Sequence, residues 1–109
     1  MGIRNVRATH SKHLRDPAVA TEYLNEAIES GDKAVFLMAL RNLAEAQPDG
    51  IAGLAARADL GRESMYKMLS SSGNPKLETF VRLLHGLGLR LRVEPQAQGD
   101  NPDNHNALA

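Results

Sequence analysis

The sequence contains no cysteine and no tryptophan, and only two tyrosines and two phenylalanines among its 109 residues. Without cysteine, neither a disulfide nor a thiolate metal site can contribute to folding, so stability must come from packing. The shortage of aromatic residues, with Leu and Ala supplying most of the apolar side chains, favours helices over sheets. We therefore expect an all-α or nearly all-α domain with one modest core.

Long apolar runs are also missing. No run approaches the roughly 18 residues of a membrane span, and the start lacks the apolar stretch of a signal peptide, so we expect a soluble, cytoplasmic protein. No Gly-rich phosphate loop, Ser/His/Asp arrangement or pair of carboxylates predicts an enzyme or a cofactor. His10 and His13 have a spacing that metal ligands use, but without a third ligand no metal site is expected.

The formal net charge is zero, yet the charges are segregated along the chain. Residues 1–15 contain bases and no acid, whereas residues 16–32 contain acids and no base. Residues 57–92 again have an excess of bases, namely Arg57, Arg62, Lys67, Lys76, Arg82, Arg90 and Arg92. The pattern predicts an acidic first helix and a basic half that can face phosphate, although ordinary solvated faces would produce similar clusters.

Apolar spacing and cap residues predict five helices. The first begins at Asp16-Pro17 and ends at Gly31, and the second begins after Asp32 and ends at Pro48. Three shorter helices are expected over residues 51–58, 62–69 and 77–87. Together they define a helical domain over residues 15–94.

The two ends of the chain differ from this domain. Residues 1–14 read as a flexible basic arm, and residues 95–109 as a disordered tail. Between the last helix and the tail, Leu89, Leu91 and Val93 alternate with charged residues, which predicts a short β-strand. A single strand needs a partner, either the same segment of a second copy across a dimer axis or a strand of a different protein.

Residues 51–70 have the spacing of a helix-turn-helix motif. Ala55 is the small residue where two helices cross, and Leu60 is the apolar residue of the turn. Met65, Met68 and Leu69 then face inward, which leaves the start of the second helix exposed to bases and phosphates. By spacing alone, the plain packing of a helical corner explains the pattern equally well.

The candidate DNA contacts are Arg62, Glu63, Ser64, Tyr66, Lys67 and Lys76. Arg62 and Lys67 are the strongest, because long cations at an exposed helix start have an obvious anionic partner. Glu63 would accept a hydrogen bond from cytosine or pair with Lys67 one turn on. Tyr66 would contact phosphate through its hydroxyl or pack at the edge of the core.

Residues 50–90 resemble the Cro/C1-type (XRE) helix-turn-helix family. The resemblance rests on Leu54-Ala55, on Leu60, on the run from Ser64 to Leu69, on Gly73-Asn74-Pro75 and on Leu77 to Leu89. It implies a five-helix fold, with the motif of residues 51–70 binding double-stranded operator DNA.

The upstream half resembles the addiction-module antidote proteins, which are HigA-like antitoxins of type II toxin-antitoxin pairs. The matching residues are Leu14 to Pro17, Glu22 to Ala27, Gly31-Asp32, Leu43-Ala44 and Gly88 to Leu91. The resemblance implies a homodimer that neutralises a small RelE/ParE-like (HigB-type) toxin and represses its own operon. Either the acidic helix or the basic arm with the terminal strand would bind a basic toxin, and we favour the N-terminal half.

The sequence departs from the family pattern at the motif itself. Gly61 replaces the Ser that usually caps the second helix, which costs only a few tenths of a kcal/mol. Ala52 and Gly53 replace polar residues of the first helix, and Lys76 replaces another capping Ser, exchanging a cap for a possible phosphate contact. Two alternatives to an antitoxin therefore stay open: a stand-alone phage-type repressor, and a helical interaction module that does not bind DNA.

Overall fold

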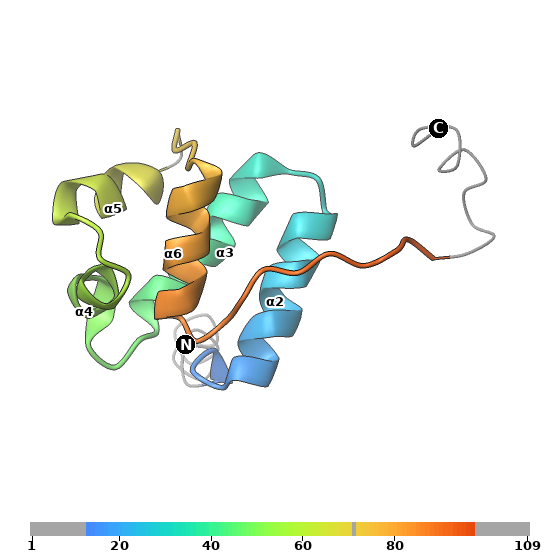
Figure 1. Ribbon diagram of the computed structural model, residues 1–109, viewed down its shortest axis with the longest axis horizontal. Coiled ribbons are helices and arrows are strands. Elements are labelled where there is room, and N and C mark those ends of the chain that lie inside the picture. Colours follow the sequence, from blue (N-terminus) through green and yellow to red (C-terminus); the bar gives the residue numbers. More distant parts are fainter. Residues whose placement is uncertain (1–12, 71, 98–109) are drawn as a thin grey trace, which may run out of the picture.

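The computed structural model describes residues 13–70 and 72–97, and within these ranges all regular secondary structure is helical. The helices are α2 (Pro17–Glu29), α3 (Lys33–Glu45), α4 (Gly50–Arg57), α5 (Arg62–Met68) and α6 (Leu77–Gly86), as Figure 1 shows. Their positions confirm the predicted helical chain. The predicted arm and tail lie largely outside the described residues, as does His10. No helix in the described ranges is long and apolar enough to cross a membrane.

The first two helices begin where the sequence places their caps. An Asp16 carboxylate oxygen accepts a hydrogen bond from the Ala18 amide at 2.9 Å, and Asp32 accepts one from the Ala34 amide at the same distance. Between them, Gly31 has a φ of +71°, a conformation that glycine adopts without steric cost. These local features reverse the chain and bring α2 against α3.

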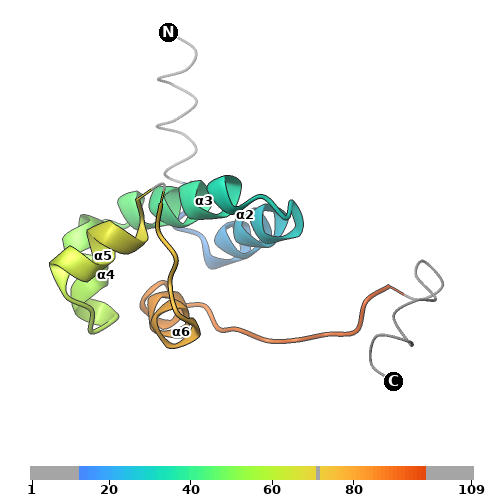
Figure 2. The same cartoon turned by 90° about the horizontal axis from the view of Figure 1, so that it is seen from above.

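The helices surround a single core, in which α4 contacts both α3 and α6, and α6 lies to one side of the other helices in the view of Figure 2. Four helices contribute completely buried side chains, among them Leu40 of α3, Leu54 of α4, Met65 of α5 and Leu83 of α6. Phe36 and Phe80 meet edge to face beside this core, with their ring centroids 5.5 Å apart. The apolar surface of α3 extends beyond the core, because Val35 and Met38 are exposed.

Helices α4 and α6 approach closely at Gly86. A Cβ atom on this glycine would lie 2.9 Å from a terminal carbon of Leu54 and 3.2 Å from the Cβ of Ala58. Leu54 is completely buried, so its side chain has no free space into which to move. The glycine therefore permits the contact that positions the helix-turn-helix against the rest of the core.

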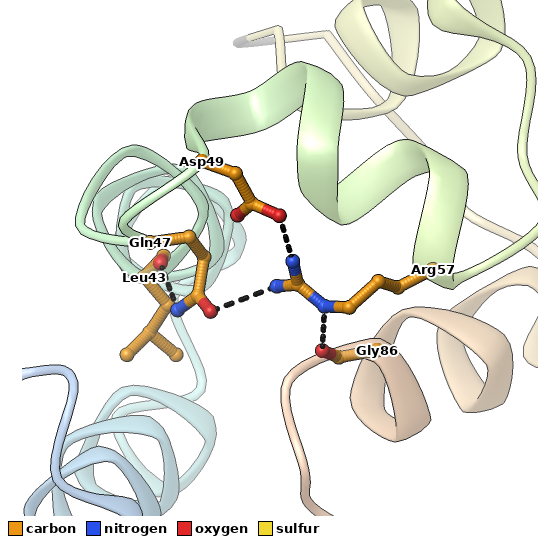
Figure 3. Close-up of polar contacts among 5 residues, drawn as sticks. All are labelled: Leu43, Gln47, Asp49, Arg57 and Gly86. Carbon is orange, nitrogen blue, oxygen red and sulfur yellow. Dashed lines mark hydrogen bonds and ion pairs between the residues drawn. The ribbon is translucent and has the colours of Figure 1, made fainter.

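Arg57 holds the same junction together through polar contacts (Figure 3). Its Nε donates to the Gly86 carbonyl at 3.1 Å, and one terminal nitrogen donates to the Gln47 side chain at 3.0 Å. The other terminal nitrogen forms an ion pair with Asp49. Gln47 in turn donates to the Leu43 carbonyl at 3.0 Å. One guanidinium thus links the α3–α4 turn, α4 and the end of α6.

The Arg57 contact also changes the acidity of Asp49. The hydrogen bond from the guanidinium is the largest influence, and it lowers the pKa of Asp49 from its ordinary value of 3.8. Gly53 makes this geometry possible, because a Cβ at that position would lie 2.0 Å from the Asp49 carboxyl carbon. The absence of a side chain at position 53 therefore leaves room for the carboxylate.

The segment that follows α6 is extended and forms no strand within the single chain, over residues 89–97, all of which are described. A β-strand requires a hydrogen-bonded partner, so the strand predicted over residues 89–94 stays a prediction that concerns a second chain.

Asn in place of Asp49 should lower stability near neutral pH and have progressively less effect in acid. The pKa of Asp49 is lower in the folded chain than in the unfolded chain, so its contribution is fully present above about pH 4. That contribution is lost as the pH falls through the folded-state pKa. Urea unfolding of both proteins between about pH 3 and pH 7 measures this; a difference in free energy of unfolding that is independent of pH would contradict the assignment.

Candidate nucleic-acid interface

The turn between α4 and α5 is set by the way α4 ends. The Leu60 amide donates to the Ala55 carbonyl at 2.9 Å, and the Asp59 amide donates to the Ala56 carbonyl at 3.2 Å. This is the Schellman pattern, in which the residue after the cap takes a left-handed conformation. Asp59 does so with a φ of +58°, which aspartate tolerates better than most residues. The chain then turns sharply and enters α5.

The inward face of the motif matches the sequence-based expectation. Ala55 is buried where α4 meets its neighbours, and Leu60 is partly buried against the core. Met65 is completely buried, and Met68 and Leu69 are 6% and 3% exposed. Because these apolar side chains attach α5 to the core, the opposite face of α5 must point outward.

Four of the candidate contact residues occupy that outward face. Arg62, Glu63, Ser64 and Lys67 are all exposed, and they lie on the first two turns of α5. Tyr66 is 51% exposed, so it lies at the surface of the helix and not in the core. The fold therefore presents five of the six predicted residues on one short helix at the edge of the domain (Figure 1).

The start of α5 is open. Gly61 is the N-cap residue, with the extended backbone of φ −68° and ψ 152°, and no side chain caps the helix. Lys76 occupies the equivalent position of α6, also without a side-chain cap, and it is exposed. Both helix starts therefore lack a side-chain cap, as the sequence predicts, whereas the phosphate contact expected of Lys76 stays a prediction.

The basic residues of this half fall into two groups. Arg57 is engaged at the helix junction, and Arg82 donates to Glu78 at 3.2 Å and to the Asp59 carbonyl at 3.4 Å. By contrast, Arg62 and Lys67 take part in no ion pair within the described ranges, and none joins Glu63 to Lys67. The pairing considered for Glu63 is thus not formed, and the cations of α5 remain available.

The contacts of Arg57 were not predicted from the sequence, which placed this residue among the bases that face phosphate. Its partner carbonyl belongs to Gly86, 29 positions away, and no local sequence pattern predicts such a contact. The acid at position 49, eight residues before the base, was the only available signal. Arg57 is therefore a structural residue, and the basic surface is smaller than the sequence indicates.

Within residues 13–70 and 72–97, no group of three or more His, Asp or Glu side chains is arranged to hold a metal ion. The exposed face of α5 instead presents cations, a hydroxyl and a carboxylate, which are groups that bind phosphates and base edges.

Comparison with known proteins identifies a family that matches most of the chain. The model of a family described as "probable addiction module antidote protein" matches residues 6–95. An uncharacterized protein of Haemophilus influenzae is 31% identical over 84 residues, which covers 77% of this chain and 84% of the relative. No solved structure matches the chain.

Proposed function

Because the chain belongs to the family of probable addiction module antidote proteins, we propose that it is an antitoxin with two binding surfaces. One surface, the outward face of α5, binds operator DNA and represses the operon that encodes the pair. The other surface, on α2, binds and neutralises a small RelE/ParE-like toxin in the cytoplasm. Both activities are binding reactions, and the proposal assigns no catalysis to the chain.

The proposal for DNA rests mainly on the availability of Arg62 and Lys67. Both side chains are exposed on a helix whose other face is fixed by Met65 and Met68. A helix held in this way can enter the major groove, where Arg recognises guanine and Lys neutralises phosphate. Glu63 and Ser64 would make neighbouring contacts, and Tyr66 and Lys76 would reach phosphates. A homodimer would place two such helices on a palindromic operator.

The proposal for the toxin rests on α2. Glu22, Glu26 and Glu29 are exposed, and none of them forms an ion pair within the described ranges. Beside them, Ile28 is 45% exposed and lines a hollow of about 470 Å³ together with Phe36 and Phe80. Exposed glutamates on the same helix as an apolar side chain that lines a hollow suit a basic protein partner, because charge guides the encounter and apolar contact retains it.

Replacing both Arg62 and Lys67 with Ala should weaken binding to a duplex from the chain's own promoter by at least about tenfold. The slope of log affinity against log salt should fall by roughly 0.9, because Lys67 is directed at a phosphate whereas Arg62 is directed at a base. Fluorescence anisotropy at several salt concentrations measures both quantities. The control is Lys33 and Arg41 to Ala, which removes the same charge from α3 and should leave the affinity within about twofold.

Unchanged affinity and unchanged salt slope in the α5 variant would refute the DNA-binding role of this face. If the wild-type chain produced no duplex shift at any salt concentration, the helical interaction module would be the correct alternative.

Changing Glu22, Glu26 and Glu29 to Gln should slow association with the toxin encoded in the neighbouring reading frame by at least about tenfold at low salt. Surface plasmon resonance measures the rate, and survival of cells that co-express the toxin reports neutralisation. The matched control changes Glu45 and Glu78 to Gln and Asp59 to Asn, which removes equal charge from α3, from α6 and from the turn after α4. Equal loss of association in both variants would contradict a specific role for α2. A chain that binds the duplex but rescues no toxic frame would be a stand-alone repressor.

A further inference from the structure

In the segment after α6, residues 89–97, the apolar side chains become more exposed with distance from the helix. Leu89 is partly buried against the core, Leu91 is 45% exposed, and Val93 is 92% exposed. Within residues 13–70 and 72–97, no backbone group of residues 90–97 has a backbone hydrogen-bond partner. Residues that alternate like a strand thus leave the domain with an uncovered apolar side chain and unpaired peptide groups.

The start of this segment is set by the way α6 ends. The Leu89 amide donates to the Leu84 carbonyl at 2.8 Å, and the Gly88 amide donates to the His85 carbonyl at 3.0 Å. Gly88 has a φ of +81°, so α6 ends in a Schellman motif. The chain that follows runs past α2 (Figures 1 and 2), and Leu91 lines the hollow between α2 and α6.

We propose that this segment pairs with the same segment of a second copy of the chain, as an antiparallel two-stranded ribbon with its two-fold axis at Val93. The proposed function already includes a homodimer; the inference adds which segment forms the contact between the copies, and it does not depend on binding of DNA or toxin. It places the most exposed apolar residue of the segment against itself at the centre of the contact. It also gives partners to the peptide groups that the single chain leaves unpaired.

Charge selects this register. With the axis at Val93, Arg92 of each copy lies opposite Glu94 of the other, and Arg90 lies opposite the neutral Gln96. An axis at Leu91 would set Arg90 against Arg92 twice. An axis at Arg92 would pair Arg90 with Glu94, but it would also set the two Arg92 side chains against each other. A parallel, in-register ribbon would oppose every like charge. Because like charges directly opposite are unfavourable and opposite charges favourable, the axis at Val93 satisfies the sequence best.

Pro95 is compatible with the same register. Proline has no amide hydrogen, so it must occupy a position where the amide is not used in the ribbon. Opposite pairs alternate between hydrogen-bonded and non-hydrogen-bonded, and Pro95 faces Leu91 two positions from the axis. Placing Pro95 in a non-hydrogen-bonded pair makes the central Val93 pair non-hydrogen-bonded as well. Arg92 and Glu94 then form the hydrogen-bonded pairs.

Cysteine scanning tests the position of the axis, and the absence of native cysteine makes the full chain suitable for it. A non-hydrogen-bonded pair has a Cα separation of about 4.5 Å, within the range of a disulfide. Among single cysteine variants at residues 89–95, Val93→Cys should give the highest yield of cross-linked dimer on mild oxidation. In Arg92→Cys, each cysteine would lie opposite residue 94 of the other copy, two residues along the strand from that copy's cysteine. The two Cα atoms would be about 8 Å apart and should cross-link poorly.

Charge reversal tests the pairing independently. Arg92→Glu and Glu94→Arg should each raise the dimer dissociation constant several-fold, and the double variant R92E/E94R should restore it. The matched control R90E/E94R carries the same reversals in a different pair, and it should not restore the dimer. Light scattering in the absence of DNA and toxin measures a mass of twice 11.8 kDa for the dimer. Circular dichroism verifies that each variant keeps its helices.

The proposal is supported if cross-linking peaks at position 93 and R92E/E94R recovers the dimer. A peak at another position, recovery by R90E/E94R instead, or a wild-type chain that stays monomeric in the concentration range of the assay would overturn it. Because neither DNA nor toxin is present, these outcomes are independent of the antitoxin proposal.

Discussion

The close approach of α4 to α6 at Gly86 is the contact on which the remaining geometry depends. It is possible because position 86 has no side chain, and Arg57 reinforces it by donating to the Gly86 carbonyl. With α4 held in this way, the Schellman turn at Asp59 aims α5 outward. Just after Gly86, α6 ends in the Schellman motif at Gly88, and the extended segment begins there. The proposed DNA-binding face and the proposed dimer contact thus originate from one junction.

The departures from the family pattern acquire a structural meaning at this junction. Gly53 lacks the polar group that would contact DNA from α4, but its missing side chain leaves room for Asp49 beside Arg57. The first helix of the motif is therefore used for internal stability, and the proposed recognition of DNA is left to α5. Gly61 leaves the start of α5 without a side-chain cap, so packing of Met65 and Met68 must hold this short helix in place.

Local signals explain how much of this could be predicted. Asp16 and Asp32 cap their helices within two residues, so the sequence locates both helix starts. Met65 and Met68 share a face through helical periodicity alone. The role of Arg57 was beyond such reasoning, because its contact with Gly86 spans 29 positions and depends on how the helices pack. The same is true of Glu63, whose spacing to Lys67 permits an ion pair that the side chains do not form. The predicted strand over residues 89–94 requires a second chain, and the structure of a single chain does not show that pairing.

The central claim is that the outward face of α5 is the surface that meets DNA. The most direct measurement is an NMR titration of the isotopically labelled chain with a duplex from its own promoter, following each backbone amide. We expect the largest shifts over residues 61–67, with smaller ones near Lys76 and little change along α2. Shifts concentrated on α2, or no shifts at low salt, would contradict the claim.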